Sequence, residues 1–396
     1  MNIIIFEDHN IQNLHPFSIN HASFELKCGI YSNIDRIIRI FPQASNYYLI
    51  VRDELKDLIQ EKFPRCIVNP KIIPEGLYLN GAVVWNVKDK EKISDCYATS
   101  NSGSLVAFNS NNEISFNTID DTIDKISKVT SDIEVNYISY LWDCIDSLKD
   151  VLENDKKSWE YENENLDNLN KTIILINKEN LYLSKTAIID PGSILDAKDG
   201  PIIINKNVHI KSGAIIKGPI YLDCESVVNE GAKLKGNILI GPNCKVGGEI
   251  TDSIFQGYSN KQHDGFLGHS FIGEWVNLGA NTNNSNLKNN YGKIKFKFSD
   301  KTINTNRIFL GSMIGDFTRT GISTMINTGS YIGLGANIFG AGFQNKYIES
   351  FSWGENEVTD FNKFIEVIKN MKKRRFKKVT DSEIFFLKFF YNFINK

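Results

Sequence analysis

The sequence predicts two domains and a tail: an α/β domain, a parallel β-helix and a short helical segment at the C-terminus. Three observations lead to this prediction. Strand-like and helix-like segments alternate in the first third of the chain, a six-residue hydrophobic repeat fills the middle, and two helix-like segments close the sequence. We expect the α/β domain with its linker to span residues 1–170, the β-helix 180–345 and the helical tail 346–396.

The N-terminal segment alternates between two hydrophobic periods. The runs MNIIIF and NYYLIV are short and β-rich, whereas CGIYSNIDRIIRIF and DELKDLIQEKF carry apolar residues at helical spacing. Strands that alternate with helices are typical of an α/β domain. A further helix is expected near YISYLWDCIDSLKDVLEND.

The six-residue repeat determines the prediction for the middle of the chain. An aliphatic residue recurs at every sixth position, and a residue that is mostly smaller follows each one after four positions. The first series is Ile204, Ile210, Ile216, Leu222, Val228, Leu234, Ile240 and Val246, and the second is Val208, Ala214, Ile220, Ser226, Ala232, Ile238, Cys244 and Ile250. A period of six fits neither an α-helix nor an alternating strand, but it is typical of a β-helix with six-residue sides. The aliphatic series is expected to fill the interior of the coil and the smaller series to lie near its corners, and polar residues such as Asn205 and Asp223 are expected to point outward.

The repeat is interrupted twice, and at both places we expect the chain to leave the solenoid. The first interruption is a loop around 257–266, and the second is an insertion near 283–309. Loops that project from a rigid repeat scaffold often carry binding and catalytic residues. The first loop contains His263, whose neutral imidazole can accept a proton from an attacking amine or hydroxyl near neutral pH. The alternative is a surface histidine without a role, and His269 is expected on a different side of the coil.

The linker and the tail carry simpler signals. The polar run SWEYENENLDNLNK is expected to be a linker, and FNKFIEVIKNMKKRR and DSEIFFLKFFYNFINK are expected to be helices. Thr380 or Asp381 is the expected N-cap of the second helix.

Composition narrows the classes of function. The chain has 45 basic and 47 acidic residues and a formal charge of −2, so no general attraction to nucleic acid or to anionic membranes is expected. No stretch approaches the ~20 apolar residues of a membrane span, and no signal peptide is expected at the start. The six cysteines include no CxxC pair, which favours free thiols in a reducing cytoplasm.

A run rich in asparagine, VNLGANTNNSNLKNNYGK, is the second candidate site. Asn277 and Asn286 can hydrogen-bond a sugar or a thioester carbonyl, and Lys288 or Lys293 can meet a phosphate. The alternative is a turn-rich loop, because asparagine and glycine tolerate left-handed conformations. Spacing alone does not separate these interpretations.

Two further segments carry weaker signals. The basic run at 369–378 is interpreted as a solvated helix face, or alternatively as a contact with an anionic ligand or a neighbouring subunit. The first strand lacks the glycine-rich phosphate loop that opens many nucleotide-binding domains. No glycine precedes Gly29, and Glu7 and Asp8 stand where main-chain amides would approach a triphosphate.

Several segments resemble a known enzyme family. GPNCKVGGEI, YSNKQHDGFLGHSFIGEWVNLGANTNNSNLKNNYG, IGDFTRTGISTMINTG and ANIFGAGF are similar to the bifunctional glucosamine-1-phosphate N-acetyltransferase / N-acetylglucosamine-1-phosphate uridylyltransferase family, in its divergent Bacteroidetes-like branch. The resemblance is dense over 180–355. Over 1–150 it rests on LHPFSINHASFELKCGI and YLWD, which look like the opening and closing motifs of that branch's nucleotidyltransferase-like domain.

The resemblance implies a left-handed β-helix that forms a homotrimer and binds acetyl-CoA between adjacent subunits. His263 falls on the family's catalytic base, in an H-x-x-[YF]-[LV]-G motif. Glu249 matches a glutamate that touches the amino sugar, and Asn277 and Asn286 match two family asparagines. We therefore expect catalytic roles for His263 and Asn277, and substrate-binding roles for Glu249, Phe266, Asn286, Lys288 and Lys293.

This sequence departs from the family pattern in both domains. Phe266 replaces a common tyrosine and Thr251 a usual phosphate-binding lysine, which leaves the sugar phosphate open. The G-x-G-T-R loop is absent, and Lys27 is the one counterpart of the lysine that follows it. Uridylyl transfer also needs Mg²⁺ held by a carboxylate, and the sequence does not identify that carboxylate. The N-terminal domain is therefore interpreted as a degenerate nucleotidyltransferase.

The expected function is acetyl-CoA-dependent N-acetylation of an amino sugar phosphate similar to glucosamine-1-phosphate. It would serve the synthesis of UDP-N-acetylglucosamine or a related sugar nucleotide. UTP and Mg²⁺ would be needed only if the N-terminal domain is active. One alternative is a sugar-1-phosphate nucleotidyltransferase whose β-helix serves oligomerisation, and another is a non-catalytic regulatory or assembly protein.

Overall fold

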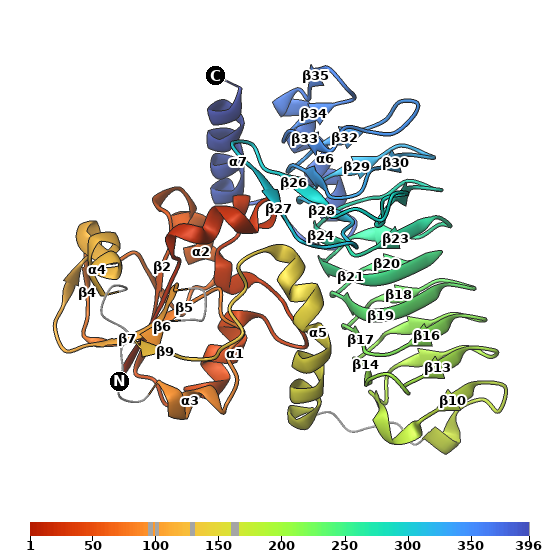
Figure 1. Ribbon diagram of the computed structural model, residues 1–396, viewed down its shortest axis with the longest axis horizontal. Coiled ribbons are helices and arrows are strands. Elements are labelled where there is room, and N and C mark those ends of the chain that lie inside the picture. Colours follow the sequence, from red (N-terminus) through yellow and green to blue (C-terminus); the bar gives the residue numbers. More distant parts are fainter. Residues whose placement is uncertain (94–97, 100–102, 127–130, 160–165, 396) are drawn as a thin grey trace. The chain divides into compact units, whose positions relative to one another are not determined.

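The computed structural model describes residues 1–93, 98–99, 103–126, 131–159 and 166–395, which divide into two compact units (Figure 1). Unit 1 comprises Met1–Leu14, Asn20–Tyr140 and Val379–Lys396, and unit 2 comprises His15–Ile19 and Leu141–Lys378. This division differs from the predicted boundaries at two helices. The helix that begins at Leu141 belongs with the β-helix, and the last helix of the chain belongs with the α/β unit.

Unit 1 is built on a mixed sheet in the order β3-β2-β1-β5-β7-β6-β9. These strands are β1 (Asn2–Phe6), β2 (Asn46–Ile50), β3 (Ile67–Val68), β5 (Gly76–Asn80), β6 (Ala98–Thr99), β7 (Leu105–Ser110) and β9 (Ser131–Asp132). β1 is parallel to its neighbours β2 and β5, whereas β7 is antiparallel to β5 and β6. β4 (Ile72–Ile73) and β8 (Ile114–Ser115) form a separate pair. The predicted strands MNIIIF and NYYLIV are confirmed as β1 and β2.

Unit 1 contains both of the helices that the apolar spacing of the N-terminal segment predicted. Its helices are α1 (Asn33–Ile40), α2 (Lys56–Lys62), α3 (Asp89–Lys92), α4 (Ile119–Ile126) and α7 (Asp381–Ile394). α1 begins with a capping box, in which the side chains of Ser32 and Asp35 each accept from the other's main-chain amide. α7 begins at the expected cap, because Thr380 Oγ1 accepts from the Glu383 amide at 3.2 Å.

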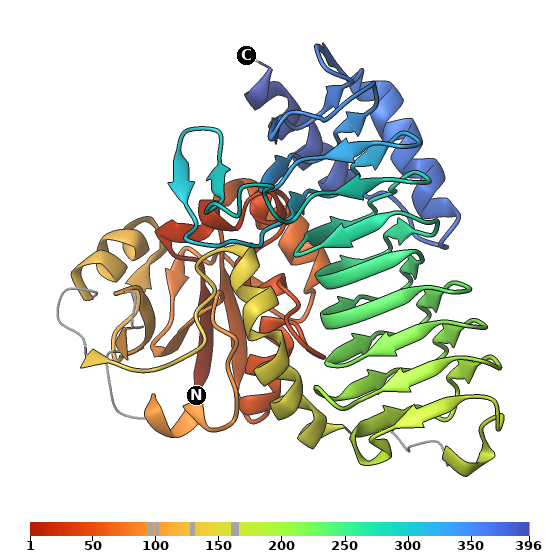
Figure 2. The same cartoon turned by 45° about the vertical axis from the view of Figure 1, so that its right-hand side comes forward.

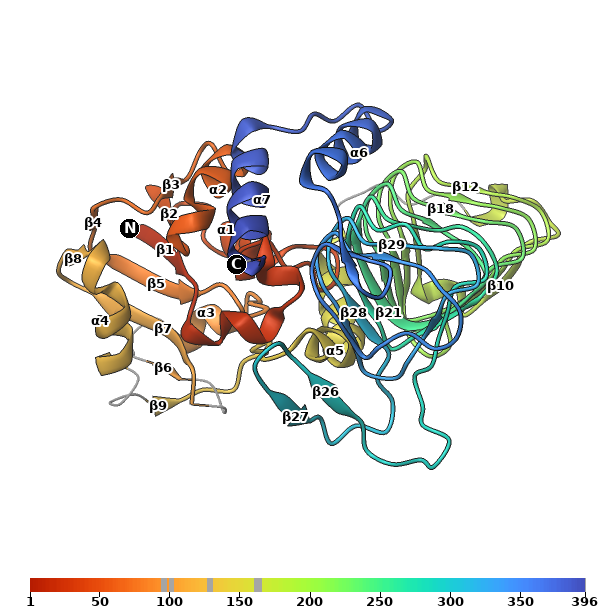
Figure 3. The same cartoon turned by 90° about the horizontal axis from the view of Figure 1, so that it is seen from above.

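Unit 2 is a parallel β-helix with three faces, which confirms the fold predicted from the repeat (Figures 2 and 3). The first face contains β10 (Ile174–Ile176), β13 (Ile194–Asp196), β16 (Ile215–Lys217), the first parts of β19 (Lys233–Ile240) and β21 (Glu249–Gly257), β23 (Phe266–Gly268), β25 (Asn283–Asn284) and β30 (Met325–Ile326). The second contains β11 (Leu181–Leu183), β14 (Ile202–Ile204), β17 (Ile220–Leu222), the second parts of β19 and β21, β24 (Phe271–Glu274), β28 (Ser312–Ile314), β31 (Ser330–Ile332) and β33 (Tyr347–Ile348). The third contains β12 (Ile188–Ile189), β15 (His209–Ile210), β18 (Val227–Val228), β20 (Lys245–Val246), β22 (Asn260–Lys261), β29 (Arg319–Thr320), β32 (Asn337–Ile338), β34 (Ser352–Trp353) and the antiparallel β35 (Glu357–Val358).

The interior of the coil is filled by the two series of the six-residue repeat. Every residue of both series is buried. Equivalent residues of successive coils stack in register, with Ile210 paired to Val228 and Val228 paired to Val246. The apolar area removed from water by this stacking is what stabilises the solenoid.

Asn205 and Asp223, which were expected outside the coil, are buried. Asn205 Nδ2 donates to the Tyr221 hydroxyl and to Asp223 Oδ1, both at 2.9 Å, and the Tyr221 hydroxyl donates to the same oxygen at 2.8 Å. Burial, and after it the Asp223 charge, raises the pKa of Tyr221 well above its usual value. Tyr221 alternates with the interior residues Ile220 and Leu222, so the cluster lies on the outer side of the coil, where the three residues satisfy one another although they are buried.

The predicted projecting loop at 257–266 does not form, and the period is lost because the coil is shortened just before it, between Val246 and Phe255. β22 continues the third face and β23 the first, each paired in parallel with the strand of the preceding coil. Val246 pairs with Lys261, fifteen residues later, whereas Val228 pairs with Val246, eighteen residues later. The repeat is lost here because the coil is three residues shorter.

The shortened coil places a lysine at an interior position. Lys261 is 1% exposed and takes the place that Val246 has in the coil before it. Its ammonium donates to the carbonyl oxygens of Gly247 at 3.3 Å and His263 at 2.7 Å. Burial lowers the pKa of Lys261 to about 8, although the charge of Asp264 acts in the opposite direction.

The second interruption is an insertion, as predicted, but it starts later. β25 pairs with β30, so the chain is still in the coil at Asn283 and Asn284. A bridge between Leu287 and Phe309 closes the excursion. It contains the antiparallel hairpin of β26 (Lys295–Lys297) and β27 (Thr302–Asn304), seen in Figure 3.

Two helices cover the β-helix. α5 (Leu141–Asp155) packs on β19, β21 and β24, and α6 (Phe361–Lys373) places Phe364 against Phe317 and Phe351. Part of the predicted linker, 160–165, lies outside the described residues. No helix in the described ranges combines the length and apolar character needed to cross a membrane. The five cysteines described have free thiols, and Cys96 lies outside that part of the chain.

Candidate functional site

The first face of the β-helix brings three of the predicted residues together. Glu249 in β21 pairs in register with Phe266 in β23, so the two side chains are neighbours on the outer surface. Glu249 also accepts from Lys235 Nζ at 3.0 Å. A Cβ on Gly268 would lie 2.6 Å from Asn286 Nδ2 and 2.7 Å from Phe266 Cζ. The absence of a side chain at Gly268 therefore allows the Asn286 amide and the Phe266 ring to meet.

His263 lies at the corner between the third and first faces, in the turn between β22 and β23. Its side chain is exposed, and its carbonyl oxygen is held by the Lys261 ammonium. The turn ends at Gly265, with a φ of +127°, where a Cβ would lie 2.3 Å from the Thr282 carbonyl oxygen of the next coil. The imidazole is thus presented by an anchored turn beside Phe266.

Asn277 lies on a different face from Asn286. It bridges Asn260 and Arg319 in the stack of the third face, and its side chain is exposed. The structure therefore does not bring Asn277 together with Glu249 and Phe266. It lies on the other side of the corner that carries His263.

Lys288 and Lys293 lie in the insertion and point to different partners. Lys288 Nζ donates to the Lys293 carbonyl at 2.6 Å, and the residue lines a cavity of about 460 Å³ together with Lys346. Burial, and after it the charge of Lys288, lowers the pKa of Lys346. Lys293 Nζ donates to Asn306 Oδ1 at 3.1 Å, within the insertion. A cavity with two ammonium groups suits an anion such as phosphate, which favours Lys288 over Lys293.

His269 contacts a predicted site residue, which the spacing of the repeat did not reveal. Its Nδ1 lies 2.9 Å from Asn286 Nδ2, and its ring stacks on Phe309 with centroids 5.2 Å apart. Its Nε2 lies 3.8 Å from Asp252 Oδ2. Asn286 and Phe309 flank the insertion, so no pattern in the sequence could have predicted their contact with His269.

The basic run at 369–378 packs on aromatic rings at the turns of the β-helix. The Lys372 ammonium lies 5.5 Å from the centroid of the Trp275 ring, and the Lys377 ammonium lies 5.9 Å from that of Tyr258. The Trp275 and Tyr258 rings stack with centroids 4.4 Å apart. These two lysines are therefore held against the β-helix by cation–π contacts.

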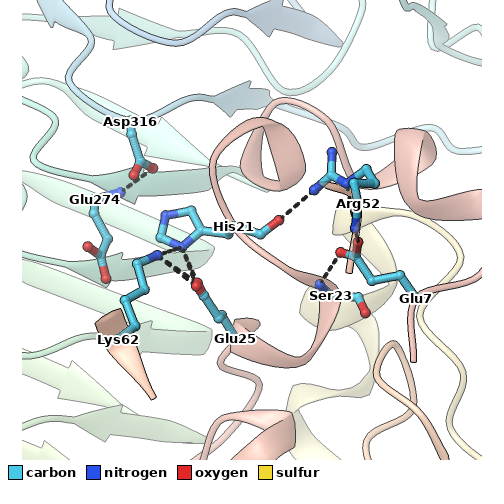
Figure 4. Close-up of polar contacts among 8 residues, drawn as sticks. All are labelled: Glu7, His21, Ser23, Glu25, Arg52, Lys62, Glu274 and Asp316. Atoms are coloured by element: carbon cyan, nitrogen blue, oxygen red, sulfur yellow. Dashed lines mark hydrogen bonds and ion pairs between the residues drawn. The ribbon is translucent and has the colours of Figure 1, made fainter. Parts of the chain in front are cut away.

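In unit 1, an ion pair between the buried Glu7 and the partly exposed Arg52 joins the carboxyl ends of β1 and β2 (Figure 4). Glu7 accepts from the Ser23 amide at 3.1 Å, and from the amide and Nε of Arg52, both at 3.2 Å. Burial raises the pKa of Glu7, although Arg52 acts in the opposite direction. The residue after β1 is thus part of the core, where a glycine-rich phosphate loop would otherwise lie.

Asp8 is the centre of a polar cluster at the carboxyl ends of β1 and β5. Its Oδ2 accepts from Asn80 Nδ2 at 2.8 Å and from the Tyr137 hydroxyl at 2.7 Å, and its Oδ1 accepts from the Asn10 amide at 2.9 Å. Open α/β sheets bind ligands at the carboxyl ends of their strands. Lys27 lies in the turn before α1, where its main chain pairs with Ser32.

The comparisons with known proteins agree with this architecture in part. Residues 3–163 match the family described as sugar nucleotidyl transferase. The N-terminal segment thus has the sequence pattern of a sugar nucleotidyl transferase. A protein of Sulfurisphaera tokodaii named bifunctional sugar-1-phosphate nucleotidylyltransferase/acetyltransferase is 33% identical over 149 residues, 37% of this chain and 37% of that protein. The bifunctional protein GlmU of Wigglesworthia glossinidia brevipalpis is 34% identical over 139 residues, 35% of this chain and 28% of the relative.

These matches span about a third of the length of the curated relatives. Among solved structures, the UDP-N-acetylglucosamine acyltransferase of Francisella novicida aligns over 54% of this chain and 87% of its own, with 12% identity and a TM-score of 0.31.

Proposed function

We propose that unit 2 is an acetyl-CoA-dependent N-acetyltransferase for an amino sugar phosphate similar to glucosamine-1-phosphate. It would act in the cytoplasm, in the synthesis of UDP-N-acetylglucosamine or a related sugar nucleotide. The observation that carries this proposal is the anchored turn of His263 beside the outer face that holds Glu249, Phe266 and Asn286. The names of the relatives from Sulfurisphaera and Wigglesworthia support the assignment.

In the proposed reaction, the amine of the sugar attacks the thioester carbon of acetyl-CoA. The imidazole of His263 takes the proton of the attacking amine, a C–N bond forms, the C–S bond breaks, and the proton passes to the leaving thiolate. A donor at the carbonyl oxygen, from the Asn277 amide or a main-chain N–H, contributes about 3 kcal/mol to the transition state. The exposed position of His263 allows both substrates to reach it.

The substrate is bound on the first face. The Glu249 carboxylate, held by Lys235, accepts from sugar hydroxyls, and the Phe266 ring packs on the apolar side of the sugar. Lys288 with Lys346 meets the phosphate. The proposed assembly is a homotrimer, because Asn277 and Asn286 lie on two sides of one corner and a second chain would supply the opposite wall for acetyl-CoA.

The test measures thiol release from acetyl-CoA by the full chain. Glucosamine-1-phosphate is expected to support turnover of ~1–10³ per second, whereas glucose-1-phosphate, which lacks the amine, should support none. Light scattering of the same preparation should give the mass of three chains. Inactivity with every amino sugar phosphate would overturn the proposal and leave the regulatory alternative, and full activity as a single chain would remove the inter-subunit site.

Unit 1 supports a second candidate, a sugar-1-phosphate nucleotidyltransferase. The match over residues 3–163 and the Asp8 cluster at the strand ends favour it. The cluster fits Mg²⁺ poorly, because both oxygens of Asp8 already accept hydrogen bonds from neutral donors.

Uridylyl transfer by unit 1 is expected to be weak or absent. The measurement is pyrophosphate release from UTP with Mg²⁺ and N-acetylglucosamine-1-phosphate, and we expect less than ~1 turnover per second, below the usual enzyme range. A rate inside that range would show that the Asp8 cluster rearranges to hold the metal. That result would support the nucleotidyltransferase function of unit 1 as strongly as the acetyltransferase function of unit 2.

A further inference from the structure

The contact between His269 and Asn286 has a defined donor and acceptor. Asn286 Nδ2 can only donate, so His269 Nδ1, 2.9 Å away, accepts. The ring is then the tautomer that carries its proton on Nε2, the atom that faces Asp252 Oδ2 at 3.8 Å. The contact fixes the plane of the Asn286 amide, so Oδ1 is a positioned acceptor and the second N–H of Nδ2 a positioned donor for further partners.

The His269 ring is held in place on several sides. Its main-chain amide donates to Thr251 at 3.1 Å, and its carbonyl accepts from the Gly311 amide at 2.8 Å, so the residue is tied to the coils on both sides. A φ of +49° at His269 turns the chain between β23 and β24. The ring stacks on Phe309, which lies at the end of the insertion.

The charged groups around the ring come from three elements. They are Asp252 in β21, Asp146 in α5, and Arg307 in the segment before β28. Arg307 forms ion pairs with Asp143 and Asp146. Burial is the largest effect and lowers the pKa of His269, with Asp252 and Asp146 opposing it and Arg307 adding to it. The lowered pKa favours the neutral ring, which the contact with Asn286 requires.

We propose that His269 is a positioning residue that fixes the amide of Asn286 so that Oδ1 accepts a hydrogen bond from the bound amino sugar phosphate. The substrate in this statement rests on the proposed function of unit 2. Protonation of His269 Nδ1 would place its N–H against the N–H of Asn286 Nδ2. The amide would then rotate by about 180° to present Oδ1 to the ring. Substrate would then meet a donor where the neutral state offers an acceptor, so substrate affinity falls as the pH falls through the pKa of His269.

The test is a double-mutant cycle that is followed by kinetics. His269→Ala is expected to raise the KM for glucosamine-1-phosphate about tenfold, the value of one hydrogen bond, with kcat and the KM for acetyl-CoA changed less than about twofold. His269→Gln keeps an acceptor that does not titrate, so it should restore the KM and remove its rise at low pH. The double variant His269→Ala/Asn286→Ala should be no worse than Asn286→Ala alone.

A second readout does not depend on activity. ¹⁵N NMR of the full chain at pH 7.5 should show His269 protonated at Nε2 only, and Asn286→Ala should change the Nδ1 shift. Effects on KM that add in the double variant, or a ring protonated at Nδ1, would overturn the proposal. A wild-type protein inactive on every amino sugar phosphate would overturn the proposed function and the substrate named here, while the NMR result would still decide whether His269 holds the amide.

Discussion

His263→Ala is expected to lower the rate of acetyl transfer by about 10²–10⁴-fold, the usual effect of losing a general base. The side chain is exposed at a corner of the coil, so its removal opens no cavity in the core. The main chain at this residue is held by the Lys261 ammonium through the carbonyl, which the substitution leaves in place. The melting temperature should therefore change little, and thiol release from acetyl-CoA measures the loss.

His209→Ala is the matched control for this substitution. His209 is a second histidine of the same β-helix, in β15, and its Nε2 contacts Asp190 at 2.9 Å on the partly exposed third face. Its replacement should leave the rate within about twofold. A His263→Ala enzyme that kept more than about a tenth of the activity, against the 10²-fold minimum for a base, would remove His263 from the mechanism.

Lys261→Ala is expected to lower the free energy of unfolding by about 2–5 kcal/mol, as for other large-to-small changes in a core. The substitution leaves a space at an interior position between coils, and it leaves the carbonyls of Gly247 and His263 without their donor. Removing a buried ammonium also removes its desolvation cost, which offsets part of the loss. Denaturant unfolding at pH 7 measures the net effect.

The pH dependence of stability gives a second signature of Lys261. Burial, the larger effect, lowers its pKa in the folded protein to about 8 from the ordinary 10.5. Between these values the unfolded chain binds a proton that the folded chain does not, so this residue makes stability rise with pH across that window. Below about pH 8 the lysine is charged in both states and the contribution is constant. Lys261→Ala should lack the rise.

Lys217→Ala controls for the loss of a lysine. Lys217 ends β16 on the outer surface and is exposed, so its replacement should change the unfolding free energy by less than about 0.5 kcal/mol. Equal stability of the Lys261→Ala and wild-type proteins would show that the interior position collapses without cost. If the unfolding free energies of the wild-type and Lys261→Ala proteins changed equally with pH, the Lys261 ammonium would be hydrated in the folded protein.

The regular parts of the fold could be predicted from the sequence because they depend on local periods. A spacing of six places Ile210, Val228 and Val246 in one interior column, and the apolar spacing at 33–40 places α1. The irregular parts depend on contacts between distant residues. The shortened coil appeared in the sequence as a loss of period, and a loss of period does not distinguish three missing residues from an added loop.

The candidate site was predictable to a similar extent. Glu249, Phe266 and Asn286 were identified by resemblance, and the pairing of β21 with β23 explains why the first two are neighbours. Nothing in the spacing predicted that the first face and the third face separate Asn286 from Asn277. His269 was missed because its partners flank an insertion whose path across the coil has no signature in the sequence.

The buried cluster of Asn205, Tyr221 and Asp223 has a consequence for how the coils choose their neighbours. Isoleucine stacks on isoleucine almost equally well if one coil is displaced by a full repeat, so a solenoid of apolar rungs alone has several pairings of similar energy. Asn205 joins β14 to β17, because its Nδ2 donates to the Tyr221 hydroxyl and to Asp223 Oδ1, whereas the bond between Tyr221 and Asp223 lies within one coil. A displaced pairing would leave the buried Asn205 amide without these two acceptors, at about 1–3 kcal/mol. The polar contact therefore favours one pairing of these two coils over pairings that the apolar residues alone would allow.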